Sequence, residues 1–99
     1  MDISIFHVDF NEMVDERTVL LSRDDAKRDI SHAWVSLYEG MLVRVVQEDV
    51  DENGEPDDLV AEGIVMKNNF SDWSAHVKWC CRINDFGIRY RSEIQGSSA

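Results

Sequence analysis

Long apolar runs and proline are scarce in this chain of 99 residues. Its longest apolar stretches, such as Met41-Leu42-Val43 and Gly63-Ile64-Val65-Met66, span three or four residues, whereas a membrane-crossing helix needs about twenty. The single proline and the 43% hydrophobic content are typical of a globular chain rather than a disordered one. Because the first residues lack the basic and apolar regions of a signal peptide, we expect a cytoplasmic protein that does not enter a membrane.

Motifs for catalysis and metal binding are also missing. The two cysteines, Cys80 and Cys81, are adjacent, and we expect reduced thiols on opposite faces of a strand because a bridge between neighbours is strained. On an extended strand His76 would lie about 13 Å from Cys80, which is too far for proton transfer. The sequence has no Gly-rich phosphate loop, no nucleophile elbow and no histidines at metal-ligand spacing. We therefore expect a protein that is not an enzyme and that holds no metal or cofactor.

Basic residues are the third shortage. The chain has 10 Lys and Arg against 20 Asp and Glu, a formal net charge of −10 at pH 7. Such a surface repels phosphates, which argues against nucleic acid as a direct partner and favours a basic protein. The charge is also uneven, because residues 48–62 contain eight acids and no Lys or Arg, whereas residues 76–91 contain four basic residues and one acid.

Strand patterns dominate the chain from Gly40 onward. Two β-branched runs flank an acidic stretch with Asn53-Gly54 at its centre, and two further segments alternate apolar with polar residues. This pattern predicts a mainly β fold, a small antiparallel barrel or roll, in a single domain over residues 1–99. The strand-like segments are residues 41–46, 59–67, 75–83 and 88–94; residues 68–72 and 84–87 are turn-like, and residues 95–99 are expected to form a flexible tail.

Residues 1–39 have a weaker pattern and form either an N-terminal extension or the first strands. Residues 3–10 and 18–21 are rich in strand formers. Ser22 with acids two and three residues later resembles a helix N-cap, so residues 23–30 are expected to form either one short helix or a polar loop.

The order of segments from Gly40 to Ile94 resembles the strand plan of SH3-like and Tudor-like small barrels. The resemblance rests on Gly-Met-Leu-Val-Arg-Val-Val, a long acidic loop, Val-Ala-Glu-Gly-Ile-Val, Trp-Ser-Ala-His-Val-Lys-Trp and Gly-Ile-Arg-Tyr, with turns between them. It implies a binding module whose loops and exposed aromatic residues carry recognition.

The acidic stretch is the first candidate binding site. Asp49 to Gly54 matches the first half of a calcium loop, but Pro56 and Val60 occupy later positions where an EF-hand needs other residues. A solvated hairpin loop is therefore favoured over calcium binding, although Asp57, Asp58 or Glu62 would close a different, irregular cage. The clustered carboxylates either steer a basic partner or serve solubility, and both readings stay open. The candidate binding carboxylates are Asp49, Asp51, Glu52, Asp57 and Asp58.

Tryptophans are the second candidate feature. Trp79 lies on the apolar side of its predicted strand and is expected in the core. Core burial is also the favoured expectation for Trp34 and Trp73, with an exposed interface anchor as the alternative for each.

Three functions are compatible with these features. The first is an acidic interaction module, such as an inhibitor, immunity protein or adaptor, that binds a basic protein surface through the acidic stretch with Trp34 or Trp73 as anchor. The second is a nucleic-acid mimic that blocks a DNA- or RNA-binding enzyme, and the third is a calcium-binding domain. A homodimer is compatible with the sequence but not required by it.

Overall fold

The structure of the chain, a computed structural model, describes residues 3–70 and 73–96. Over these residues the protein is mainly β, as predicted, with one short helix, and measures 40 × 30 × 23 Å. Residues 97–99 of the predicted tail and residues 71–72 of a predicted turn lie outside the described residues. The elements are β1 (Ser4–His7), β2 (Met13–Asp15), β3 (Thr18–Ser22), β4 (Ala26–Arg28), β5 (Trp34–Ser36), β6 (Leu42–Gln47), β7 (Leu59–Lys67), β8 (Trp79–Ile83), β9 (Arg89–Tyr90) and α1 (Arg91–Gly96).

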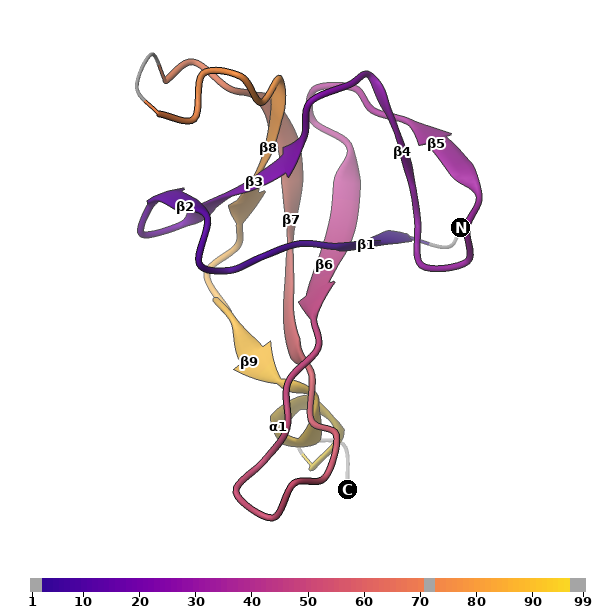
Figure 1. Cartoon of the computed structure of the whole chain (residues 1–99), viewed down its shortest axis with the longest axis vertical. Coiled ribbons are helices and arrows are strands. Elements are labelled where there is room, and N and C mark those ends of the chain that lie inside the picture. Colours follow the sequence, from indigo (N-terminus) through magenta and orange to yellow (C-terminus); the bar gives the residue numbers. More distant parts are fainter. Residues whose placement is uncertain (1–2, 71–72, 97–99) are drawn as a thin grey trace.

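Seven strands form the main sheet, in the order β1-β6-β7-β8-β3-β2, with β9 beside the first residues of β7 (Figure 1). β1 runs parallel to β6, and the other strand pairs of the sheet are antiparallel. β1 and β2 end the order without pairing to each other, so within the described residues the sheet is mixed and does not close into a barrel. Three of the five strands from residues 1–39 belong to this sheet.

β4 and β5 form a separate two-stranded ribbon. It replaces the helix or polar loop that was expected over residues 23–30. The Ser22 hydroxyl does bond to the next residues, donating to the Asp24 carbonyl at 2.9 Å and accepting the Asp24 N–H at 3.2 Å. These bonds close a turn rather than cap a helix, because Ala26–Arg28 then pairs with Trp34–Ser36.

The main sheet has two faces of unequal burial. Its inner face carries the core, which includes Phe6, Val45, Val65 and Cys81, all 0% exposed. Side chains of β5 and of the segment between β1 and β2 pack against this core. The outer face carries a smaller buried cluster, made of Leu20, Val77 and Cys80 with the partly buried Val14 and Met66.

The adjacent cysteines follow from this arrangement. Both are free and buried, and they belong to different clusters, Cys81 to the core and Cys80 to the outer cluster. The expectation that the two thiols lie on opposite faces of one strand is confirmed. Burial raises the pKa of Cys80 to about 11 and that of Cys81 to about 12.

Gly63 marks the closest approach of two strands in the sheet. A Cβ at this position would lie 2.1 Å from the carbonyl oxygen of Arg82 and 2.9 Å from the sulfur of Cys81. No side chain fits there, so β7 and β8 require glycine for their contact.

The last third of the chain departs from the predicted alternation. β8 begins at Trp79 rather than at residue 75, because the Asn68 amide donates to the carbonyls of Ser74 (2.8 Å) and Val77 (2.9 Å) and holds a turn before the strand. The strand expected over residues 88–94 ends at Tyr90, and α1 follows. Residues 95 and 96, which were expected to belong to the flexible tail, are part of this helix. In the part of the chain that the structure describes, no helix has the length and apolar character needed to cross a membrane.

Candidate interaction site

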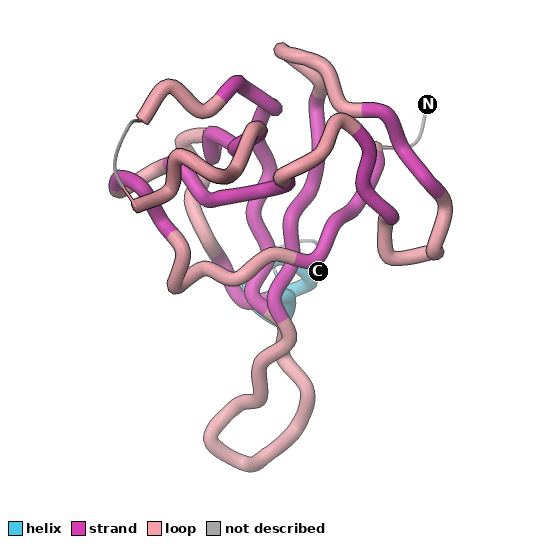
Figure 2. Tube along the Cα trace, turned by 45° about the horizontal axis from the view of Figure 1, so that its top comes forward, coloured by secondary structure: helices cyan, strands magenta, loops and turns pink. Residues whose placement is uncertain are grey.

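The segment between β6 and β7, residues 48–58, is called the acidic loop. It projects from the end of the sheet, away from the rest of the molecule (Figure 2). Its own backbone contacts hold it as a narrow hairpin, including Asp51 N–H to Glu55 carbonyl at 2.8 Å and Asp57 N–H to Asp49 carbonyl at 2.9 Å. The turn residue Gly54 has a φ of 80°, which favours glycine.

Two of the predicted binding carboxylates shape this hairpin. The Asp51 carboxylate accepts the N–H groups of Asn53 (2.8 Å) and Glu55 (2.9 Å), and the Asp49 carboxylate accepts the N–H of Val50 at 2.8 Å. The oxygens that resemble calcium ligands in sequence therefore bond to the loop's own backbone. Within residues 3–70 and 73–96, no group of three or more His, Cys, Asp or Glu side chains is placed to hold a metal ion.

Two further predicted carboxylates attach α1 to the base of the loop. The Asp57 carboxylate accepts the Ser92 N–H at 3.0 Å and the Ser92 hydroxyl at 2.7 Å. The Asp58 carboxylate lies 3.3 Å from the Arg91 guanidinium, and its carbonyl accepts the Arg91 N–H at 2.8 Å. Both carboxylates thus have partners within the chain.

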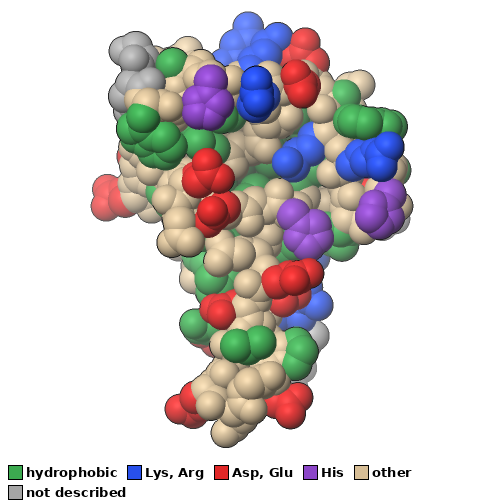
Figure 3. All heavy atoms as spheres, viewed as in Figure 1, with side chains coloured by type: hydrophobic (Ala, Val, Ile, Leu, Met, Phe, Trp, Pro, Cys, Tyr) green, Lys and Arg blue, Asp and Glu red, His purple; other side chains and the backbone are tan. Residues whose placement is uncertain are grey.

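The outward carboxylates of the acidic loop belong to Glu48, Glu52 and Glu55. All three residues are exposed, and their carboxylates make no hydrogen bond or ion pair with the described residues. Val50 lies among them with 57% of its surface exposed. The projecting end of the molecule accordingly combines acidic and apolar side chains (Figure 3). Glu52 was among the predicted residues, whereas Glu48 and Glu55 were missed although they lie in the same acidic run.

Trp34 and Trp73 are exposed, by 67% and 58%, so the favoured expectation of core burial is wrong for both. Trp34 lies on β5, where the Arg28 guanidinium stacks over its ring at 5.0 Å. Trp73 lies in the connection from β7 to β8, at the opposite end of β7 from the acidic loop. The structure therefore does not bring either tryptophan together with the acidic loop (Figure 1).

Trp34 borders a shallow hollow of about 700 Å³ near the β4–β5 ribbon. Basic and imidazole side chains line part of it, among them Lys27, His7 and His76, but acids such as Asp9 and Asp24 line it too. Burial lowers the pKa of Lys27. With charges of both signs, this hollow has no clear preference for the charge of a ligand.

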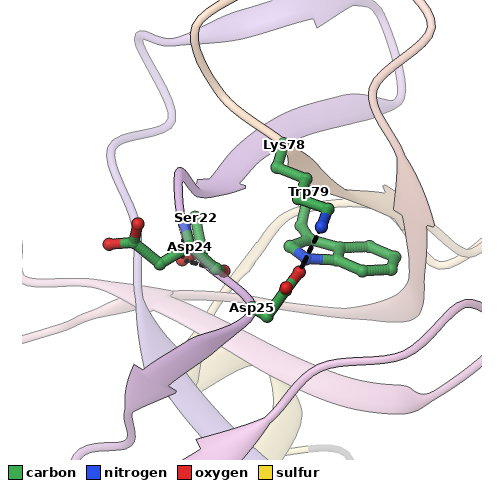
Figure 4. Close-up of polar contacts among 5 residues, drawn as sticks. All are labelled: Ser22, Asp24, Asp25, Lys78 and Trp79. Atoms are coloured by element: carbon green, nitrogen blue, oxygen red, sulfur yellow. Dashed lines mark hydrogen bonds and ion pairs between the residues drawn. The ribbon is translucent and has the colours of Figure 1, made fainter.

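Trp79 is buried in the core, as predicted, and its indole also holds the base of the β4–β5 ribbon. Its Nε1 donates to the Asp25 carboxylate at 3.0 Å, and the Lys78 ammonium lies 2.6 Å from the same oxygen (Figure 4). The bonds from Lys78 and Trp79 lower the pKa of Asp25. This network is structural, because it ties the start of the ribbon to β8.

Comparison with known proteins adds no relative. No protein-family model matches the chain, and no curated protein or solved structure matches it significantly. Support for a function therefore comes from the surface of the molecule itself.

Proposed function

We propose that this protein is an acidic protein-interaction domain that binds a basic surface of a partner protein through the acidic loop. The observation that carries the proposal is the loop's geometry, a projecting hairpin held by its own hydrogen bonds. It presents Glu48, Glu52 and Glu55, whose carboxylates have no partner among the described residues, around the exposed Val50. A preformed loop loses little conformational entropy on binding.

Charge gives this loop its expected role in association. Three outward carboxylates on a chain of net charge −10 attract a basic surface from solution and raise the association rate, an effect that salt weakens. Val50 adds an apolar contact at the centre. An inhibitor, an immunity protein or an adaptor is the kind of protein in which such a loop serves, and the proposal retains the fold-level resemblance to SH3-like and Tudor-like binding modules.

The test replaces Glu48, Glu52 and Glu55 with glutamine. Asp49, Asp51, Asp57 and Asp58 stay in place because they form the loop and attach α1. The matched control carries Glu16→Gln, Asp24→Asn and Glu39→Gln, which removes the same number of exposed carboxylates outside the loop. Each protein is used as bait in lysate from the native host at low and at high salt, and captured proteins are identified and purified for affinity measurement.

We expect a basic protein that binds the wild type and the control at low salt and that loses at least about tenfold in affinity for the loop variant. Equal loss in the loop variant and the control would contradict the proposal, because the effect would then follow net charge alone. A captured DNA- or RNA-binding enzyme that nucleic acid displaces from the bait would instead support the nucleic-acid mimic.

A further inference from the structure

A row of apolar side chains crosses the middle of the outer face of the main sheet. Leu42 of β6 and Ile64 of β7 are register partners, and Ile3 precedes β1 beside them. Leu42 is 65% exposed, and Ile3 and Ile64 are each 40% exposed. All three line one hollow of about 520 Å³, which we call the outer groove.

The outer groove has a buried cluster on one side of it and a second hollow on the other, both on the same face of the sheet. On one side, Val77 and Val14 pack over Cys80 and Met66. On the other side, Ile94 of α1 borders a second hollow of about 250 Å³, and Glu62 lines both hollows. Exposed aliphatic residues side by side on regular strands are unusual in a soluble domain and are typical of binding surfaces.

Arginine is concentrated on this face although the whole chain is strongly acidic. Three of the arginines have acidic partners, in the pairs Arg17–Asp85, Arg44–Glu62 and Arg91–Asp58, the second at 2.9 Å and the third at 3.3 Å. The outer groove itself is lined by Arg17 and Arg82 with the acids Glu62 and Asp85, and the second hollow adds Arg44, Arg89 and Arg91 with no further acid, so together the hollows have five of the ten basic residues of the chain.

Arg82 and Arg89 supply the unbalanced positive charge. Arg82 is exposed, pairs across the strands with Ile64, and makes no ion pair within the described residues. Arg89 stacks over the Phe86 ring at 5.0 Å, and its Nε is buried without a hydrogen-bond partner. The face thus offers aliphatic contacts next to two guanidinium groups that form no ion pair within the described residues, and the carboxylate whose charge interacts with Arg82 is that of Asp15.

We propose that the outer groove binds an extended acidic segment of a partner protein, with aliphatic side chains on Leu42 and Ile64 and carboxylates on Arg82. Charge complementarity selects this occupant, because arginine binds carboxylates with a matching planar geometry. A segment that alternates acidic with aliphatic residues fits the outer groove, since an extended chain presents successive side chains to opposite sides. Its aliphatic side chains would contact Leu42 and Ile64, and its carboxylates would contact Arg82. An identical face of a second copy would place unpaired arginines against each other. This groove is separate from the acidic loop and does not depend on the proposed function.

Three fluorescein-labelled peptides test the groove by fluorescence anisotropy. Each is about ten residues long, or roughly 33 Å when extended, and alternates Asp with Ile, Lys with Ile, or Asp with Ser. We expect the full-length protein to bind the Asp–Ile peptide at least about tenfold more tightly than the other two peptides. Only the Asp–Ile peptide combines negative charge with apolar side chains.

Two exposed positions supply the variants. Leu42→Ser and Arg82→Glu should each weaken binding of the Asp–Ile peptide by about tenfold. The controls Tyr38→Ser and Arg23→Glu change an exposed aromatic residue and an exposed arginine outside the outer groove and should leave binding within about twofold. Near-ultraviolet circular dichroism of the buried Trp79 confirms that each variant is folded.

Other results would overturn the proposal. Equal binding of all three peptides, or equal effects of the groove variants and the controls, would remove the groove as an acidic-segment site. Dimerisation that is lost both in Leu42→Ser and in the triple glutamine variant of the acidic loop would identify a second copy as the occupant. Binding to phosphatidylserine vesicles without binding to the peptides would identify a lipid surface instead.

Discussion

The two faces of the main sheet are formed by the same strands but have different roles. On the inner face, Val65 is fully buried, and at Gly63 the contact with β8 leaves no room for a Cβ. On the outer face, their neighbour Ile64 is 40% exposed and borders an open groove. Because successive residues of a strand point to opposite faces, one strand serves stability on one side and recognition on the other. Substitutions on the inner face should therefore change stability, and those on the outer face should change binding.

Gly63→Ala should give the largest loss of stability. The added methyl would lie 2.1 Å from the carbonyl oxygen of Arg82, a backbone atom that cannot move without separating β7 from β8. We expect the free energy of unfolding to fall by about 3 kcal/mol or more, measured by urea denaturation. The control is Gly54→Ala, which meets no atom within 4 Å and should cost about 1 kcal/mol through its positive φ. Equal losses would show that the two strands can separate at little cost.

Alkaline pH should give the next largest effect, through the two thiols. Their pKa values are about 11 for Cys80 and about 12 for Cys81 in the folded protein, above the ordinary value of 9.0. Between about pH 9 and the pKa of each folded thiol, the unfolded chain loses thiol protons that the folded chain keeps. The free energy of unfolding therefore falls as pH rises above about 9, by up to about 1.4 kcal/mol per pH unit for each thiol.

The variant Cys80→Ala/Cys81→Ala isolates this thiol contribution. Urea denaturation at a series of pH values should give a shallower alkaline decline for the variant than for the wild type. Parallel declines would mean that other groups control the alkaline loss of stability.

Val65→Ala and Ile64→Ala compare the two faces at adjacent positions. The first removes two buried carbons and should cost about 2 kcal/mol. The second removes three carbons from a partly exposed side chain and should cost about 0.5 to 1 kcal/mol. Urea denaturation of both variants measures the difference. A larger loss for Ile64→Ala would mean that the outer groove is already covered in solution.

Asp57→Ala tests how α1 is attached beside the outer face. The substitution removes the two hydrogen bonds to Ser92 and should lower the free energy of unfolding by about 1 kcal/mol. Hydrogen exchange of the α1 amides should rise more than that of β7. Glu52→Ala, an exposed acid of the same loop without an internal partner, is the control and should leave both quantities unchanged.

The strands that local pattern specifies were predicted well. The predicted strand at 59–67 matches β7, and the one at 41–46 differs from β6 by one residue, because β-branched runs with turn residues between them indicate hairpins. Long-range contacts account for the differences elsewhere. The parallel pairing of β1 with β6 leaves no local pattern in the sequence. The first turn of α1 depends on Asp57, because its carboxylate accepts the N–H of Ser92, 35 residues later in the chain.

The candidate site was predicted as a region but not as a set of residues. Charge clustering located the acidic loop, yet four of its five chosen carboxylates bond within the chain, and only Glu52 points outward without a partner. Sequence cannot separate these roles, because they depend on where α1 and the turn place their N–H groups. The outer groove was missed since Leu42 and Ile64 have the composition of core residues. The arginine content of residues 76–91 was the sequence signal that could have indicated this groove.

The pairing of β3 with β8 also sets an order on synthesis and folding. Residues 18–22 of β3 pair with residues 79–83 of β8, which are made roughly 3 to 12 s later at about 5–20 residues per second. During this interval Thr18-Val19-Leu20-Leu21, buried in the finished protein, is open to aggregation. Charged residues flank it on both sides, Asp15-Glu16-Arg17 before and Arg23-Asp24-Asp25 after, and charges that flank an apolar strand oppose aggregation. We expect these flanking charges to act before the protein has folded, while the strand is still exposed.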